Sequence, residues 1–182
     1  MSEDVRSADA LPAAGSCDGV SVPRPHVVLP TSIPGAPPEV VAAPALLSFA
    51  AEEQYRAFFE ENYCGEPTLT FDGISVRFRK RDFDHCAYKS TNRDGVKNSF
   101  CQRRAARISL IRYSLQLPTA ELYVGWDGRR YDTARRVTII QKSFVTVIRL
   151  KGDTNATFVT SYHCADRSTI QKIRGGPKWV SA

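Results

Sequence analysis

The first 45 residues contain no phenylalanine, tyrosine or tryptophan. They hold 8 of the 11 prolines of the chain, and alanine, serine and glycine fill much of the remainder. A segment of this composition cannot bury enough apolar surface to offset the conformational entropy that folding removes. We therefore expect residues 1–45 to form a disordered, Pro/Ala-rich tail outside the folded core.

The chain also has no long apolar run. It begins with Met1 and the acidic residues Glu3 and Asp4, which argues against a signal peptide or a transit peptide. No later stretch is long or apolar enough to cross a bilayer. We therefore predict a cytoplasmic protein with no membrane partner.

Several catalytic signatures are missing. The sequence contains no Gly-rich phosphate loop, no His-Glu-x-x-His and no Gly-x-Ser-x-Gly. Residues 65–182 have only 10 carboxylates, and these are scattered, whereas a two-metal nuclease needs them clustered. A nuclease with this sequence would have to work without metal, and we expect no cofactor.

The five cysteines are odd in number and include no Cys-x-x-Cys pair, so a disulfide framework is not expected. Two adjacent His-Cys pairs occur, His85-Cys86 and His163-Cys164. With Cys101 they could in principle converge on zinc, but their spacing matches no zinc pattern. We interpret the cysteines as free buried thiols and predict no metal site.

Positive charge is in excess, and it is confined to one part of the chain. Residues 1–64 hold 3 basic and 9 acidic side chains, whereas residues 65–182 hold 22 basic and 10 acidic ones, a surplus of +12. That surplus costs self-repulsion in a compact state unless a polyanion neutralises it. Nucleic acid is the first partner to consider. The 118 residues of the basic segment are enough to bury one core.

The pattern of apolar residues predicts an α+β fold, with helices first and antiparallel strands after them. Residues 46–64 are typical of an acidic amphipathic helix that precedes the basic domain of residues 65–182. An Asp72-Gly73 turn predicts a hairpin, and Ser99-x-x-Gln102 predicts a capping box that opens a helix ending near Leu115. The later elements are expected to be strands at 121–126, 136–141, 144–150 and 156–162 and a helix at 166–174.

One arginine falls among apolar residues on the helix predicted from Ser99 to Leu115. The apolar positions of that helix share one narrow sector of the helical wheel: Phe100, Ile108, Ile111 and Leu115. Arg104 lies in the middle of this sector. Either its stem packs and its head reaches solvent, or it forms an anion site between helix and sheet. Arg103 and Arg107 lie beside the sector, so three forked guanidinium groups could reach one phosphate.

His85 lies between the basic residues 79–81 and this helix. An imidazole titrates near neutral pH, so it can take a proton from one oxygen and return it to another. A lone histidine is nevertheless more often structural, and both interpretations stay open.

The predicted strand 156–162 carries three hydroxyl groups at its end. Strict alternation places Phe158, Thr160 and Tyr162 on one face and Ser161 on the other. The hydroxyls of Thr160 and Tyr162 therefore share a face, although threonine and tyrosine are also ordinary strand formers.

Taken in this order, these residues resemble the phage and prophage nuclease domains of the barnase/EndoU/colicin/RelE-like ribonuclease superfamily. The resemblance covers residues 65–180, and its order and spacing matter as much as identity. Its parts are His85-x-x-Tyr88, Phe100-x-x-x-Arg104-Ala105-x-Arg107-Ile108, Pro118, Phe158-Val-Thr-Ser-Tyr162, Ile170-x-Lys-Ile-Arg174 and Gly176-Pro177.

The resemblance implies a barnase-like RNase fold, with amino-terminal helices packed on a curved antiparallel sheet whose open face binds RNA. It also implies cleavage without metal, by attack of the ribose 2′-OH on the adjacent phosphate to leave a 2′,3′-cyclic phosphate. His85 would be the general acid or base, Arg104 would stabilise the phosphorane charge, and Thr160 would hold a phosphate oxygen. Secondary substrate contacts would come from Arg103, Arg107, Ser161, Tyr162 and Lys172.

Two functional hypotheses follow. The first is an endoribonuclease of phage or toxin type that acts on RNA, such as tRNA or another structured RNA, and has an antitoxin or immunity protein as partner. On charge alone, segment 46–64 could then cover the basic cleft until RNA displaces it. The second is a non-catalytic, basic nucleic-acid-binding accessory protein, in which Arg104 and the hydroxyls serve binding or packing only. A zinc-dependent module is the least favoured third class.

Overall fold

The computed structural model describes residues 42–91 and 97–180. The predicted tail of residues 1–45 falls mostly outside the described residues, and its described end, residues 42–45, has no helix or strand. The described residues belong to one unit that starts at residue 40. The described residues on both sides of the predicted boundary between 64 and 65 fall in this unit.

Short strands and helices come first along the described chain, and long strands follow. The elements are α1 (Glu52–Tyr63), β1 (Thr68–Leu69), β2 (Ser75–Arg77), α2 (Asp82–Ala87), β3 (Tyr88–Lys89), β4 (Ser99–Phe100), α3 (Gln102–Ala105), α4 (Ser109–Gln116), β5 (Glu121–Trp126), β6 (Tyr131–Ile140), β7 (Phe144–Leu150), β8 (Asn155–His163) and α5 (Arg167–Arg174).

The main sheet has six strands in the order β1-β2-β8-β7-β6-β5. Strands β5 to β8 form the predicted antiparallel meander, and the hairpin around Gly73 is confirmed as β1 and β2. Strand β2, however, pairs with β8 in parallel, so the sheet is mixed. The α+β class is confirmed, and the sheet is mostly rather than wholly antiparallel.

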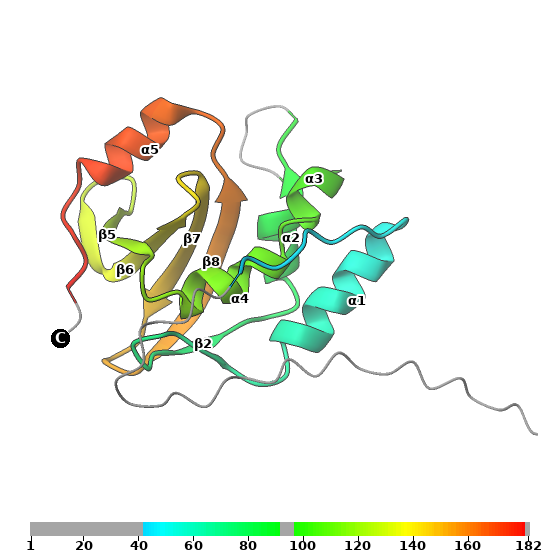
Figure 1. Ribbon diagram of the computed structural model, residues 1–182, viewed down its shortest axis with the longest axis horizontal. Coiled ribbons are helices and arrows are strands. Elements are labelled where there is room, and N and C mark those ends of the chain that lie inside the picture. Colours follow the sequence, from blue (N-terminus) through cyan, green and yellow to red (C-terminus); the bar gives the residue numbers. More distant parts are fainter. Residues whose placement is uncertain (1–41, 92–96, 181–182) are drawn as a thin grey trace, which may run out of the picture. The chain divides into compact units, whose positions relative to one another are not determined.

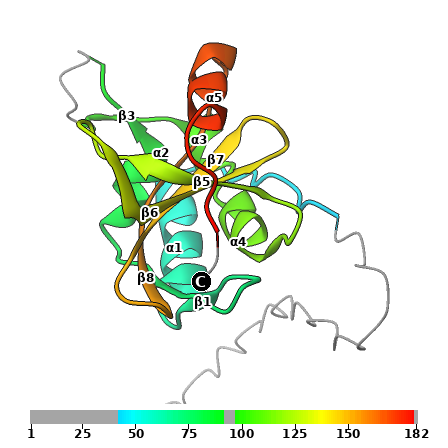
Figure 2. The same cartoon turned by 90° about the vertical axis from the view of Figure 1, so that its left-hand side faces the viewer.

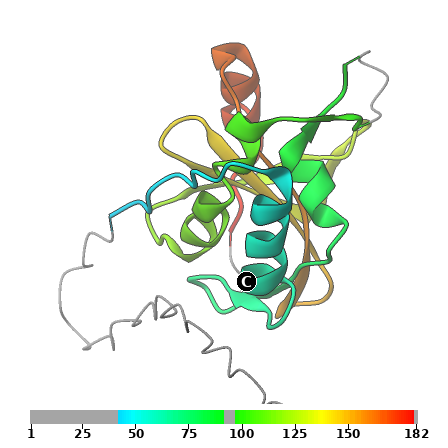
Figure 3. The same ribbon diagram turned by 90° about the vertical axis from the view of Figure 1, so that its right-hand side faces the viewer.

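Helices α1 to α4 pack on one face of this sheet. Tyr55, Phe59 and Tyr63 recur every four residues along α1 and are buried, so they form the stripe that faces the core. Figure 2 shows α1 and α4 side by side, and the Tyr63 hydroxyl donates to the carbonyl oxygen of Ile108 at 2.8 Å. Figure 3 shows α1 in front of the strands. Helix α1 is thus part of the main core.

Two predicted helices have different bounds in the structure. The segment before α1 is extended because the Leu47 amide donates to the carbonyl oxygen of Ala106, and the helix begins only at Glu52. The single helix predicted from Ser99 to Leu115 is wrong. Ser99 and Phe100 form β4, which pairs with β3, and the helical part divides into α3 and α4.

Helix α5 lies on the opposite face, over β5 and β6 and away from α1 (Figure 1). Ile170 packs there in a second cluster with Tyr123, Val137 and Val145. Residues 177–179 cover the outer edge of β5, since the Val124 amide donates to Pro177 and the Trp179 amide donates to Leu122. The sheet therefore does not present a fully open face.

Strand β8 contains a bulge at Val159. Phe158 stands opposite Ile148 and Thr160 opposite Val147, so Val159 has no partner of its own on β7. The extra residue changes which face of the sheet each of the following side chains points to. Phe158 faces the core of the helices, whereas Thr160 lies opposite Val147 of the second cluster. The prediction that Phe158 and Thr160 share a face is therefore wrong, and Thr160 and Tyr162 do share one.

Candidate functional site

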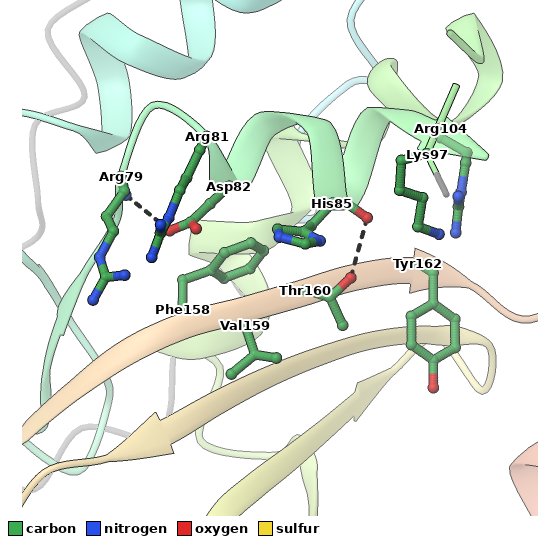
Figure 4. A pocket seen from close by; sticks show the side chains of 10 residues that line it. All are labelled: Arg79, Arg81, Asp82, His85, Lys97, Arg104, Phe158, Val159, Thr160 and Tyr162. Carbon is green, nitrogen blue, oxygen red and sulfur yellow. Dashed lines mark hydrogen bonds between the residues drawn. The ribbon is translucent and has the colours of Figure 1, made fainter. Parts of the chain in front are cut away.

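A cleft opens beside β8 at the point where β2 leaves it. The parallel pairing ends at Arg77 and Thr157, and α2 lies along the remainder of β8. The space between α2 and β8 is about 590 Å³ (Figure 4). We call it the α2–β8 cleft, and its lining residues are Arg79, Arg81, Asp82, His85, Lys97, Arg104, Phe158, Val159, Thr160 and Tyr162.

Four of the site residues predicted from sequence meet in this cleft. His85 comes from α2, Arg104 from α3, and Thr160 and Tyr162 from β8. The Thr160 hydroxyl donates to the backbone carbonyl oxygen of His85 at 3.3 Å. This contact joins the strand to the helix and leaves the imidazole of His85 uninvolved.

Four basic side chains and one carboxylate line the cleft. Within residues 42–91 and 97–180, none of Arg79, Arg81, Lys97 and Arg104 forms an ion pair. Asp82 is the acidic lining residue, and its Oδ2 accepts a hydrogen bond of 2.8 Å from the Arg79 backbone amide. Such a cluster favours binding of an anion.

Lys97 and Arg104 lie side by side at one end of the cleft (Figure 4). Burial and the nearby positive charge of Arg104 both lower the pKa of Lys97. The guanidinium of Arg104 is held there because its Nη1 donates to the carbonyl oxygen of Tyr88. Arg104 thus lines the cleft from α3, and the anion-site interpretation stays a prediction.

Arg103 and Arg107 do not line this cleft. Arg107 lines a separate hollow of about 250 Å³, together with His163 at the end of β8. Burial, and then the charges of Arg107 and Arg103, lower the pKa of His163. The structure therefore does not bring the three guanidinium groups to one phosphate.

Two further predicted residues lie elsewhere. Ser161 is buried opposite Thr146, whose hydroxyl hydrogen-bonds with Ser114 at 2.7 Å on the side of the helices. Lys172 lies on α5 and lines a hollow on the opposite face of the sheet. Neither residue reaches the α2–β8 cleft.

The described cysteines and histidines do not gather as metal ligands. In this part of the chain no group of three or more His, Cys, Asp or Glu side chains could hold a metal ion. Cys86 is buried and its thiol donates to the Asp82 and Phe83 carbonyl oxygens. Burial raises its pKa to about 12, so it stays a neutral thiol.

The acidic residues of α1 do not cover the cleft. Glu52 accepts hydrogen bonds from Arg56 and Tyr88, and Glu60 forms an ion pair with Lys80 at 2.6 Å. No residue of α1 lines the cleft. The hypothesis of an intramolecular cover by residues 46–64 is therefore wrong for this helix, which is fixed in the core by its aromatic stripe.

Sequence reasoning missed Lys97 as a site residue and treated Arg79 and Arg81 only as a basic cluster. Lys97 lies in a polar loop by sequence. The pairing of Tyr88 with Phe100 places Lys97, three residues before Phe100, near Arg104. A lysine three positions before an aromatic residue is too common a pattern to predict that Lys97 lines the cleft.

Comparisons with protein-family models, with curated proteins and with solved structures gave no match for this chain. Across the described residues, no helix combines the length and the apolar character that crossing a membrane would need. The residues of the cleft are therefore the basis on which a function can be proposed.

Proposed function

We propose that the protein is a metal-independent endoribonuclease with a barnase-like fold. In the proposed reaction the ribose 2′-oxygen bonds to phosphorus and the bond from phosphorus to the 5′-oxygen breaks. The products are a 2′,3′-cyclic phosphate and a free 5′-hydroxyl. The observation that carries the proposal is the set of cations around His85 in the α2–β8 cleft that form no ion pair with a described carboxylate.

This reaction needs one group to accept the proton of the 2′-hydroxyl and another to protonate the leaving 5′-oxygen. His85 in its neutral form is proposed as the acceptor. Lys97 is proposed as the donor, because burial and Arg104 lower the pKa of its ammonium group and make it a stronger acid. Arg104 would stabilise the negative charge of the phosphorane.

The geometry changes the role proposed for Thr160. A hydroxyl has one hydrogen to donate, and here Thr160 directs it to the carbonyl oxygen of His85. Since a phosphodiester oxygen needs a donor, Thr160 is better assigned as a positioning residue for His85. Tyr162 lines the same cleft and would contact the substrate.

The test is incubation of the purified full chain with RNA in EDTA, followed by identification of the ends. Cleavage that leaves cyclic phosphate supports the proposal. Folded His85→Ala and Arg104→Ala should each lose about 10²–10³ in rate. Lys151→Ala is the matched control, because it removes the same charge from the exposed β7–β8 turn and should cleave as the parent does.

RNA that is bound but not cut would identify the protein instead as a non-catalytic nucleic-acid-binding accessory protein. Cleavage that disappears in EDTA would also overturn the metal-independent mechanism. An antitoxin or immunity protein is proposed as a partner, and its acidic residues would complement the same cations.

A further inference from the structure

A second hollow lies on the α5 face of the sheet, with a volume of about 400 Å³ between α5, β5 and β6. Trp126 and Tyr131 are cross-strand neighbours that line it, and the two residues are 54% and 44% exposed. Their ring centroids lie 5.2 Å apart with the planes at 78°. We call this hollow the aromatic groove.

Close contacts with the backbone surround both aromatic residues. A Cβ on Gly176 would lie 2.8 Å from Cε1 of Tyr131, so the tyrosine ring rests directly on the Gly176 backbone. At the other aromatic residue, the Arg135 side chain packs on Gly125, and its Nη1 donates to the Trp126 backbone carbonyl oxygen at 3.3 Å. The Tyr131 ring therefore occupies a fixed position before a ligand stacks on it.

The charge around the groove favours an anionic chain. Lys172 of α5 lines it, and none of its lining residues is acidic. Lys172 forms no ion pair with any described carboxylate. Exposed aromatic rings can stack with the bases of a single-stranded nucleic acid, and a basic side chain beside them can neutralise a backbone phosphate.

Tyr162 of β8 lines both the groove and the α2–β8 cleft, so the two hollows adjoin at this residue. Figure 4 shows its ring pointing away from His85. Strands β8 and β6 are separated by β7 alone, which corresponds to about 10 Å. One strand of RNA could therefore occupy both places at once.

We propose that the aromatic groove binds an unpaired nucleobase of the strand whose phosphate occupies the α2–β8 cleft. The base stacks against Trp126 and Tyr131, and Lys172 pairs with a phosphate next to it. The inference rests on the proposed function in that it takes the ligand of the cleft to be RNA. Because stacking does not discriminate strongly among bases, the groove would tolerate many sequences.

The test uses the full chain with Trp179→Phe, which leaves Trp126 as the only tryptophan. The probe is a short 2′-deoxy oligonucleotide, which cannot undergo the cleavage reaction. An abasic phosphodiester of the same length is the control ligand. We expect the oligonucleotide to quench Trp126 fluorescence and the abasic chain to leave it unchanged.

In the parent chain, Trp126→Ala should weaken oligonucleotide binding about 10-fold and leave abasic binding unchanged. Gly176→Ala, which displaces Tyr131, should weaken it in the same direction. The matched control is Leu69→Ala, another exposed apolar residue on β1, which should bind as the parent does. Equal quenching by the abasic chain, or unchanged affinity of a folded Trp126→Ala, would overturn the proposal.

These outcomes are independent of catalysis. Loss of oligonucleotide affinity in Trp126→Ala, with no cleavage by the parent, would support the base site and overturn the ribonuclease proposal. Cleavage by the parent, with no effect of Trp126→Ala on oligonucleotide affinity, would support the ribonuclease proposal and overturn the base site. If both hold, Trp126→Ala should raise KM for RNA more than it lowers kcat, since Trp126 does not line the cleft.

Discussion

The hydroxyl of Thr160 donates a hydrogen bond of 3.3 Å to the backbone carbonyl oxygen of His85, a residue 75 positions earlier in the chain. We expect Thr160→Val, which keeps the shape and removes the donor, to lower RNA cleavage about 10-fold. Its free energy of unfolding should fall by no more than about 1 kcal/mol, because the contact is partly exposed. Thr160→Ser retains a donor and should retain most activity. Urea unfolding and initial cleavage rates measure the two effects, and a fully active Thr160→Val would contradict the positioning role.

Arg104 and Lys97 repel each other, which predicts a change in a measurable pKa. Burial and Arg104 lower the pKa of Lys97 below its ordinary value of 10.5. Arg104→Ala removes the second cause, so the pKa of Lys97 should rise toward that value. NMR titration of lysine side chains measures it.

The control for this titration is Arg103→Ala, because Arg103 contributes to the low pKa of His163 and does not line the α2–β8 cleft. It should raise the pKa of His163 and leave that of Lys97 unchanged. An Arg104→Ala variant in which Lys97 titrates as before would show that the two cations do not interact.

Arg136 is fully buried and forms an ion pair with Asp72 at 2.7 Å. Two of its side-chain nitrogens, Nε and Nη2, have no hydrogen-bond partner among the described residues. Asp72→Ala would leave this charge buried and uncompensated, so we expect a loss of about 3–5 kcal/mol in the free energy of unfolding. Adding Arg136→Met to Asp72→Ala should recover much of that loss. A double variant less stable than Asp72→Ala alone would show that the arginine stabilises the fold by other contacts.

The pair of Glu121 and Arg174 ties β5 to α5 and predicts a pH dependence. Hydrogen bonding from Arg174 holds the pKa of Glu121 below its ordinary value of 4.5. The stability that the pair contributes is therefore fully present above pH 4.5 and is lost as the pH falls through the lowered pKa. Because both side chains are partly exposed, solvent screening keeps this contribution small.

In thermal unfolding, Glu121→Gln should therefore have a lower melting temperature than the parent near pH 7, and this difference should shrink in acid. A matched change at the exposed Glu53 of α1 should lack this pH-dependent difference, since Glu53 forms no ion pair with a described residue. A melting-temperature difference that is equal near pH 7 and in acid would contradict the role of the ionised pair.

The elements that sequence predicted well have local causes. The strands at 121–126 and 144–150 have the predicted bounds because β-branched and aromatic residues dominate them. Helix α5 begins where expected because the Asp166 side chain accepts a hydrogen bond from the Ser168 amide.

The elements that sequence predicted wrongly depend on contacts distant in the chain. Ser99-x-x-Gln102 has the local pattern of a capping box, but Phe100 packs against Tyr88 across the β3–β4 pair, with ring centroids 5.8 Å apart. The bulge at Val159 carries no glycine or proline, so a period of two could not reveal it. Half of the predicted site residues line the α2–β8 cleft. Lys97 lies there only because of the same β3–β4 pairing.

The end of the pairing between β2 and β8 also affects the tendency of these molecules to aggregate at high concentration. A strand with unpaired backbone groups is a template on which strands of other molecules assemble into aggregates. Here the bulge at Val159 bends β8 and α2 lies along it, while residues 177–179 cover β5 at the other side of the sheet. Molecules at high concentration would therefore find few strand edges through which the sheets of two copies could pair.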